Sequence, residues 1–171
     1  MKKMFLSLLL MATTMVAAQA QKFALIDMEF ILKQIPSYEQ ANKQMESLSK
    51  QWQNAVEAKA NEAKALYENY QKSAATMSAE QRTAKENEII AKEKEAAELR
   101  QTYFGPQGEA MKKRQELISP IQDAIYNAVK EIATQRGYDA VIDRASAQSM
   151  IFASPRIDIS NEVLLKLGYS K

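Results

Sequence analysis

The segment from Ser37 to Leu117 constrains the fold of this chain most, because its apolar residues recur at the spacing of two long helices. In the first half, they alternate at steps of three and four residues, which keeps one face of a helix apolar. These residues are Tyr38, Ala41, Met45, Leu48, Trp52, Val56, Ala60, Ala63, Tyr67 or Leu66, Tyr70, Ala74 and Met77. The heptad register slips by four residues between Trp52 and Val56, which is a stutter in a coiled coil.

The second half follows a stricter pattern, in which apolar residues lie seven apart and continue past the end of the segment. They are Ile90, Ala97, Phe104, Met111, Ile118, Ile125 and Ile132. An unbroken heptad is typical of a coiled-coil seam. The sequence therefore predicts two long helices that pack against each other as an antiparallel hairpin arm over residues 37–118.

A helix-start signal separates the two halves of the arm. Ser78 precedes Gln81 by three residues, which is the spacing of a capping box, so the chain is predicted to turn near 76–78. The segment Ser37 to Gln40 repeats this pattern directly after Pro36, where the outgoing helix is expected to start. At ~1.5 Å per residue, that helix would extend roughly 58 Å, far beyond the body of a small domain.

Two interruptions fall in the returning helix. Gly105-Pro106-Gln107-Gly108 lies inside the heptad, so we expect a kink or a short unwinding there and not the end of the helix. Ser119-Pro120 has the pattern of an N-cap followed by proline at the first helical position, so the helix is predicted to be renewed or kinked at this point.

The residues on either side of the arm form a head, over 21–36 and 119–171. Phe23 to Asp27 is a short apolar run typical of a buried strand, after which Asp27 is expected to cap a short helix. Tyr138 to Asp143 is a second predicted strand, and Ser149 to Ala153 is expected to pair with it as an antiparallel hairpin. Asp158 or Ser160 is predicted to cap a last helix that ends at Gly168.

These elements predict an α+β fold, predominantly helical, in which the arm projects from a small head that contains β-strands. A sheet of this size is marginal in water, so the head is expected to oligomerise through its strands. The candidate residues for this contact are Phe23, Leu25, Val141 and Ile151.

Residues 1–20 have the features of a secretory signal peptide. Lys2 and Lys3 form a charged start, Met4 to Val16 is apolar, and Ala18-Gln19-Ala20 is a small-x-small cleavage site. A retained membrane anchor is the alternative, but the apolar run is shorter than the ~20 residues that span a bilayer. We therefore expect residues 21–171 to form one exported domain without stable membrane insertion.

Charge and composition exclude several classes of function. The chain has 23 basic and 21 acidic residues, and loss of Lys2 and Lys3 with the signal peptide would leave 21 of each. The overall charge of a neutral chain gives no strong case for nucleic-acid binding, and none is expected. With no His, no Cys and no glycine-rich phosphate loop, the chain is not expected to be an enzyme or to need a cofactor or a metal.

Several stretches together resemble the Skp (OmpH) family of periplasmic chaperones. They are the signal peptide, Phe23 to Asp27 with Ile35-Pro36, the helical hairpin, Ile121 to Ile125, Gly137 to Asp143, and Asp158 to Leu164. The resemblance implies a homotrimer whose heads form a small β-barrel, with three arms around a cavity that holds unfolded outer-membrane proteins. Members of the family are typically basic whereas this chain is neutral, so no lipopolysaccharide site is carried over to it.

The resemblance implies an ATP-independent holdase that prevents aggregation and delivers these proteins for assembly in the outer membrane. One alternative is an adaptor protein of the cell envelope, in which a partner protein would pack against the seam of the arm. The other is a structural spacer. Many seam positions are alanines, and small residues bury little area each, so the seam favours a flexible arm that holds unfolded proteins.

Four residues of the arm are candidate contacts with such an unfolded protein, called a client below: Trp52, Tyr67, Tyr70 and Met77. Packing within the seam is the alternative role for each of them.

Basic residues near the turn and in Lys112-Lys113-Arg114 suggest transient contact with anionic lipid. A solvated helix face is the simpler explanation for them.

Overall fold

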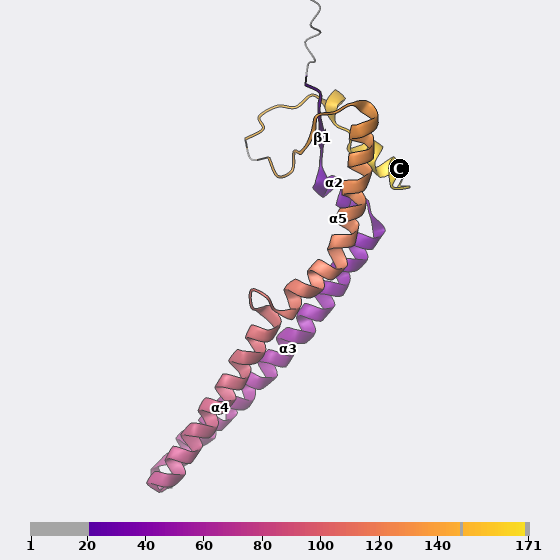
Figure 1. The fold of residues 1–171 in the computed structure, drawn as a ribbon. Helices are drawn as coiled ribbons and strands as arrows, with labels where there is room; N and C mark the ends of the chain where they lie inside the picture. Colours follow the sequence, from indigo (N-terminus) through magenta and orange to yellow (C-terminus); the bar gives the residue numbers. More distant parts are fainter. Residues whose placement is uncertain (1–20, 148, 170–171) are drawn as a thin grey trace, which may run out of the picture.

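The computed structural model describes residues 21–147 and 149–169, and shows a long helical hairpin hanging from a small head (Figure 1). The predicted signal peptide lies outside the described residues. The elements, in chain order, are β1 (Phe23–Ile26), α2 (Met28–Lys33), α3 (Pro36–Ser73), η1 (Ala74–Thr76), α4 (Ala79–Phe104), α5 (Glu109–Arg136), β2 (Ala140–Asp143), η2 (Pro155–Ile157) and α6 (Ser160–Lys166). The predicted α+β, predominantly helical class with a long hairpin arm is confirmed.

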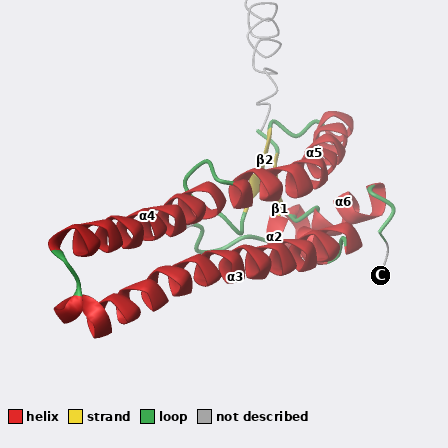
Figure 2. Ribbon diagram, turned by 90° about the horizontal axis from the view of Figure 1, so that it is seen from below, coloured by secondary structure: helices red, strands yellow, loops and turns green. Residues whose placement is uncertain are grey.

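The arm consists of α3 running outward and of α4 followed by α5 running back, with α3 alongside both (Figure 2). Ser78 and Gln81 form the predicted capping box at the start of α4: Gln81 N donates to Ser78 Oγ at 3.3 Å, and Ser78 N donates to Gln81 Oε1 at 2.9 Å. The predicted cap at Ser37 is wrong, because α3 already starts at Pro36. Proline is favoured at the first helical position, where its fixed φ suits the helix and no N–H is needed.

The returning arm is two helices and not one. The sequence predicted a kink or a short unwinding at Gly105 to Gly108 and not the end of the helix. The helix does end there, because α4 stops at Phe104 and a tight turn follows, in which Gly108 N donates to Gly105 O at 2.9 Å. A Cβ at Gly105 would collide with the carbonyl oxygen of Gln101, and one at Gly108 would lie 2.7 Å from that of Tyr103. The turn therefore folds back so closely onto the last turn of α4 that both positions need glycine.

Of the two outcomes predicted at Ser119-Pro120, a renewed helix or a kink, renewal is wrong, because α5 continues through Pro120. A proline inside a helix removes one hydrogen bond to the carbonyl four residues earlier. Pro120 and Glu116 are both exposed, so water can satisfy that carbonyl. Figure 1 shows that α5 changes direction as it passes from the arm into the head.

The described sheet has two parallel strands from opposite ends of the domain. β1 pairs with β2 from Phe23 opposite Ala140 to Ile26 opposite Asp143. The predicted hairpin is wrong: residues 149–153 are irregular, and Ile151 and Phe152 are 101% and 83% exposed. These side chains pack little against the rest of the described chain, so the packing that stabilises a strand is missing here.

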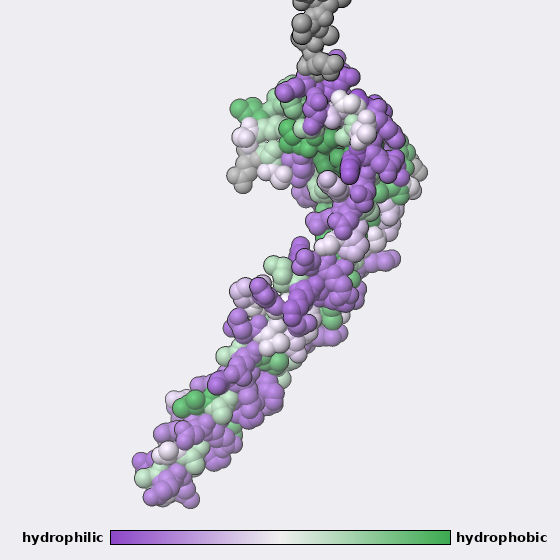
Figure 3. Space-filling model, viewed as in Figure 1, coloured by the Kyte–Doolittle hydropathy of each residue, from purple (hydrophilic) through white to green (hydrophobic). Residues whose placement is uncertain are grey.

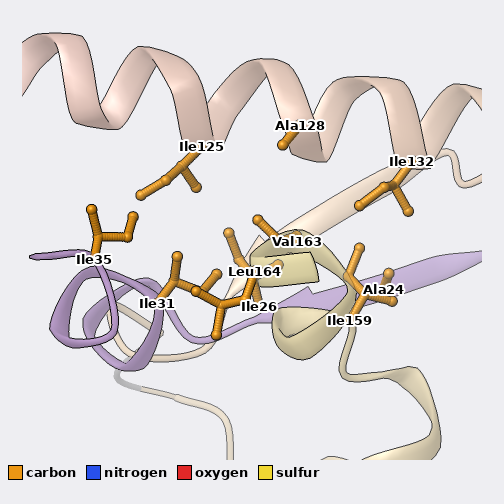
Figure 4. Packing of buried hydrophobic residues seen from close by; sticks show 10 residues of the cluster. All are labelled: Ala24, Ile26, Ile31, Ile35, Ile125, Ala128, Ile132, Ile159, Val163 and Leu164. Carbon is orange, nitrogen blue, oxygen red and sulfur yellow. The ribbon is translucent and has the colours of Figure 1, made fainter. Parts of the chain in front are cut away.

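The head has an apolar core built from β1, α2, α5 and α6, together with the residues that directly precede α3 and α6 (Figure 4). It contains Ala24, Ile26, Ile31, Ile35, Ile125, Ala128, Ile132, Ile159, Val163 and Leu164. Asp27 caps α2 as predicted, accepting from Phe30 N at 2.8 Å. The predicted cap of the last helix at Asp158 or Ser160 is wrong, because α6 starts at Ser160 with Ile159 at the N-cap position, although Asp158 accepts from Ser160 N at 2.9 Å. Arg144 joins these two carboxylates, at 3.0 Å from Asp27 and 3.4 Å from Asp158.

Candidate functional site

The seam of the distal arm lies one residue away from the predicted heptad. Ile89 and Ala96 are buried against α3, whereas Ile90 is 60% exposed and Ala97 is exposed. Farther along, Phe104 and Met111 are 39% and 56% exposed, and burial of the predicted heptad starts only at Ile118. The prediction is therefore wrong for its distal half, because the turn between α4 and α5 changes the phase of the helix that faces α3.

The seam of α3 follows the prediction more closely. Ala41 and Ala63 are buried, and Trp52, Val56, Tyr70 and Met77 are partly buried, which retains the predicted register slip. The alternating seam position is held by Lys59 and Leu66, and not by Ala60 and Tyr67, which are exposed.

Small and polar side chains occupy several seam positions in this part of the arm. Ala63 and Ala96 line the same hollow, and Lys92, which is partly buried, turns its ammonium to Glu95 at 2.8 Å. A buried alanine removes far less apolar area from water than a leucine or an isoleucine would. The distal hairpin is therefore held by few strong apolar contacts, in contrast to the head.

An aromatic cluster marks the level at which α4 ends. Trp52 of α3 stacks on Tyr103, with ring centroids 5.4 Å apart and planes 17° apart. Phe104 meets both rings edge to face, at 6.3 Å from Trp52 and 6.4 Å from Tyr103. Trp52, a candidate client contact, is thus already engaged in packing across the arm.

The other three candidate client residues are spread from the middle of the arm to its tip. Tyr67 is 47% exposed. The hydroxyl of Tyr70 donates to the carboxylate of Glu86 on α4, and this hydrogen bond, together with partial burial, raises the pKa of Tyr70. Met77 is partly buried where η1 ends. The structure therefore does not gather Trp52, Tyr67, Tyr70 and Met77 into one site.

The candidate trimer residues of the head have different environments. Leu25 is only 3% exposed and belongs to the interior of the head, and Val141 is partly buried against the core. Phe23 and Ile151 are 44% and 101% exposed. Sequence reasoning missed Ile142, 42% exposed, although its place next to inward-facing Val141 follows from the alternation of a strand.

The surface of the arm is mostly hydrophilic, with small apolar patches along it (Figure 3). Within residues 21–147 and 149–169, no helix has the length and apolar composition that crossing a bilayer requires. The same ranges contain no group of acidic side chains arranged to hold a metal ion.

Comparisons with known proteins agree on one family. A family model described as "Outer membrane protein (OmpH-like)" matches residues 22–167. The chain is 31% identical over 150 residues to "Chaperone protein Skp" of Yersinia enterocolitica, covering 86% of this chain and 87% of that protein. It is 29% identical over 160 residues to the protein of the same name from Pectobacterium atrosepticum, covering 93% and 92%.

A solved structure has the same fold. It is described as an outer membrane chaperone (OmpH-like) from Caulobacter crescentus CB15, and it matches with a TM-score of 0.66 at 12% identity, over 86% of this chain and 83% of that one.

Proposed function

This chain belongs to the OmpH-like family, and from that premise we propose that it is a periplasmic holdase chaperone for unfolded outer-membrane proteins. It binds these clients without ATP, prevents their aggregation and delivers them for assembly in the outer membrane. It is not an enzyme, which agrees with a sequence that contains no His and no Cys.

The observation that carries this proposal is the contrast between the arm and the head. The head has a continuous apolar core, whereas the buried residues of the distal seam are Ala63, Ile89 and Ala96, and exposed apolar side chains such as Tyr67 and Ile90 lie near them. Segments with few buried apolar contacts open at low free energy. An arm of this kind can adapt to clients that have no fixed shape, which an adaptor with one partner would not require.

The protein acts as a homotrimer joined through its heads. Phe23, Ile142, Ile151 and Phe152 leave apolar side chains exposed on a head whose described sheet has only two strands. Isolated sheets of this size are marginal, and burial of these side chains between copies would stabilise them. The proposed trimer places three arms side by side around a shared space.

Export precedes this function. Cleavage after Ala20 would remove residues 1–20 and leave a mature chain that starts at Gln21 in the periplasm. The intact mass of the protein from an envelope extract checks this, and a mass that still includes Met1 to Ala20 would contradict it. We propose that the protein contacts anionic lipid only transiently.

Suppression of aggregation tests the function directly. Several unfolded porins are diluted from urea with and without the mature protein, light scattering is followed over time, and the mass of the free protein is measured by multi-angle light scattering. A holdase suppresses scattering for each porin and has the mass of a trimer. Suppression for none of them, together with capture of one folded partner, would support the adaptor instead.

A further inference from the structure

One face of the arm carries a groove that repeats every seven residues. A hollow of about 480 Å³ is lined on α3 by Gln53, Val56 and Glu57, and a second of about 340 Å³ by Ala60, Ala63 and Lys64. Each residue of the first set precedes its counterpart in the second by seven. On the antiparallel helix α4, Arg100 of the first hollow is likewise seven residues from Glu93 of the second. The two hollows are therefore successive repeats of one groove between α3 and α4.

Exposed apolar side chains border this groove. Phe104, 39% exposed, lines the first hollow, and Tyr67, 47% exposed, lines the second. Ala97 and Ile90 precede Phe104 by seven and fourteen residues on the same face of α4, and both are exposed. The residues that the sequence predicts as the seam of α4 therefore form an exposed apolar stripe next to the residues that pack against α3. This stripe consists of Ile90, Ala97 and Phe104.

The charges of the groove cancel within each hollow. Glu57 and Arg100 line the first, and Lys64 and Glu93 line the second. A charged group that enters either hollow is attracted by one of these side chains and repelled by the other. The groove therefore binds a charged ligand with little electrostatic stabilisation. An uncharged apolar side chain loses nothing by this arrangement and buries area against Phe104 or Tyr67.

The exposed apolar area along the groove decides between a stable partner and a transient one. Large side chains such as Phe and Tyr bury roughly 150–250 Å² each, and Tyr67, Ile90 and Phe104 are about half exposed. Together they offer on the order of 300 Å², which is typical of a functional patch on a monomer. A stable interface needs about 800 Å² per partner, so a second copy or a folded adaptor would be held poorly.

We propose that this groove is a track for apolar side chains of an unfolded polypeptide, bound weakly in either of its two hollows. This inference rests on the proposed holdase function and names the surface that performs it. Repeated hollows suit a client without fixed structure, because any apolar side chain can occupy either one. Weak contacts at each repeat leave the client free to move and to be released without ATP.

Site-directed crosslinking tests the track, and the absence of cysteine from the chain makes the labelling specific. Ala97→Cys places a thiol on the stripe. Ala91→Cys is the matched control, since Ala91 is also an exposed alanine of α4 and lies six residues away, which turns it by about 120° around the helix. Each variant, labelled with benzophenone maleimide, is illuminated in complex with a porin diluted from urea.

We expect Ala97→Cys to crosslink the porin at least three-fold more than Ala91→Cys, and Ile90→Gln to weaken porin binding at least three-fold. Leu165→Gln is the control for the second variant, because Leu165 is 63% exposed in the head. The track proposal is wrong if both faces crosslink equally, or if Ile90→Gln and Leu165→Gln bind the porin with equal affinity, in experiments where the parent protein suppresses aggregation. If the parent protein itself fails to suppress aggregation, the holdase proposal fails instead.

Discussion

The stack between Trp52 and Tyr103 should hold α3 against the end of α4, and replacing Tyr103 with leucine measures its contribution. Leucine keeps an apolar residue in the seam but removes the ring that lies 5.4 Å from the indole and 6.4 Å from Phe104. An aromatic pair contributes roughly 0.5–1.5 kcal/mol beyond the area it buries. With two pairs lost and much of the apolar area kept, we expect the free energy of unfolding of the arm to fall by about 1–2 kcal/mol.

The chain itself supplies the probe, because Trp52 is its only tryptophan. Urea unfolding of Tyr103→Leu, followed by the fluorescence of Trp52, should give a lower midpoint than in the parent, and the native emission should move to longer wavelength as water reaches the ring. Tyr126→Leu is the control, since Tyr126 is 64% exposed on α5. If Tyr103→Leu changes the midpoint no more than this control does, the stack stabilises nothing, and Trp52 is available to clients as the sequence suggested.

Three further measurements probe the head, the turn and the arm surface. Ile125→Ala empties a fully buried position of the head core and should lower the free energy of unfolding by about 2–5 kcal/mol in calorimetry or urea titration; a loss below about 1 kcal/mol would show that the core collapses around it. Gly105→Ala forces a Cβ against a backbone carbonyl and should cost about 1–3 kcal/mol, whereas Gln107→Ala in the same turn should be nearly neutral. The pKa of Glu39 lies below its ordinary 4.5 because its carboxylate accepts a hydrogen bond from Lys43, 2.6 Å away. The ion pair therefore adds stability above about pH 4.5 that is lost as the pH falls through the lowered pKa, and NMR titration of Lys43→Gln should show the pKa of Glu39 rising.

The sequence by itself determined the features that depend on neighbouring residues. The capping box of Ser78 and Gln81 and the cap at Asp27 were predicted correctly, because a cap is made within three residues of chain. The long arm was predicted for the same reason, since a 3.6-residue period needs only the local geometry of a helix. Among the candidate client residues, this reasoning placed Tyr70 and Met77 on the inward side of the outgoing half of the arm but could not name their partners.

Only the tertiary structure decided which of two adjacent apolar heptads became the seam. Ile89 and Ile90 are equally apolar, and the turn at Gly105 to Gly108 changes the helical phase by an amount that spacing alone does not give. Contact with α3 buried Ile89 and left Ile90 at the surface, where the proposed track begins.

The strands depended on the tertiary structure for a related reason. β1 and β2 pair across more than a hundred residues and are joined by the whole arm, so no local turn signal could predict that they are parallel neighbours. The apolar run around Ile151 has the composition of a strand, yet Ile151 and Phe152 are almost fully exposed and the described sheet contains only β1 and β2. A strand is stabilised by the element beside it, and that element is chosen by the fold of the chain and not by the run itself.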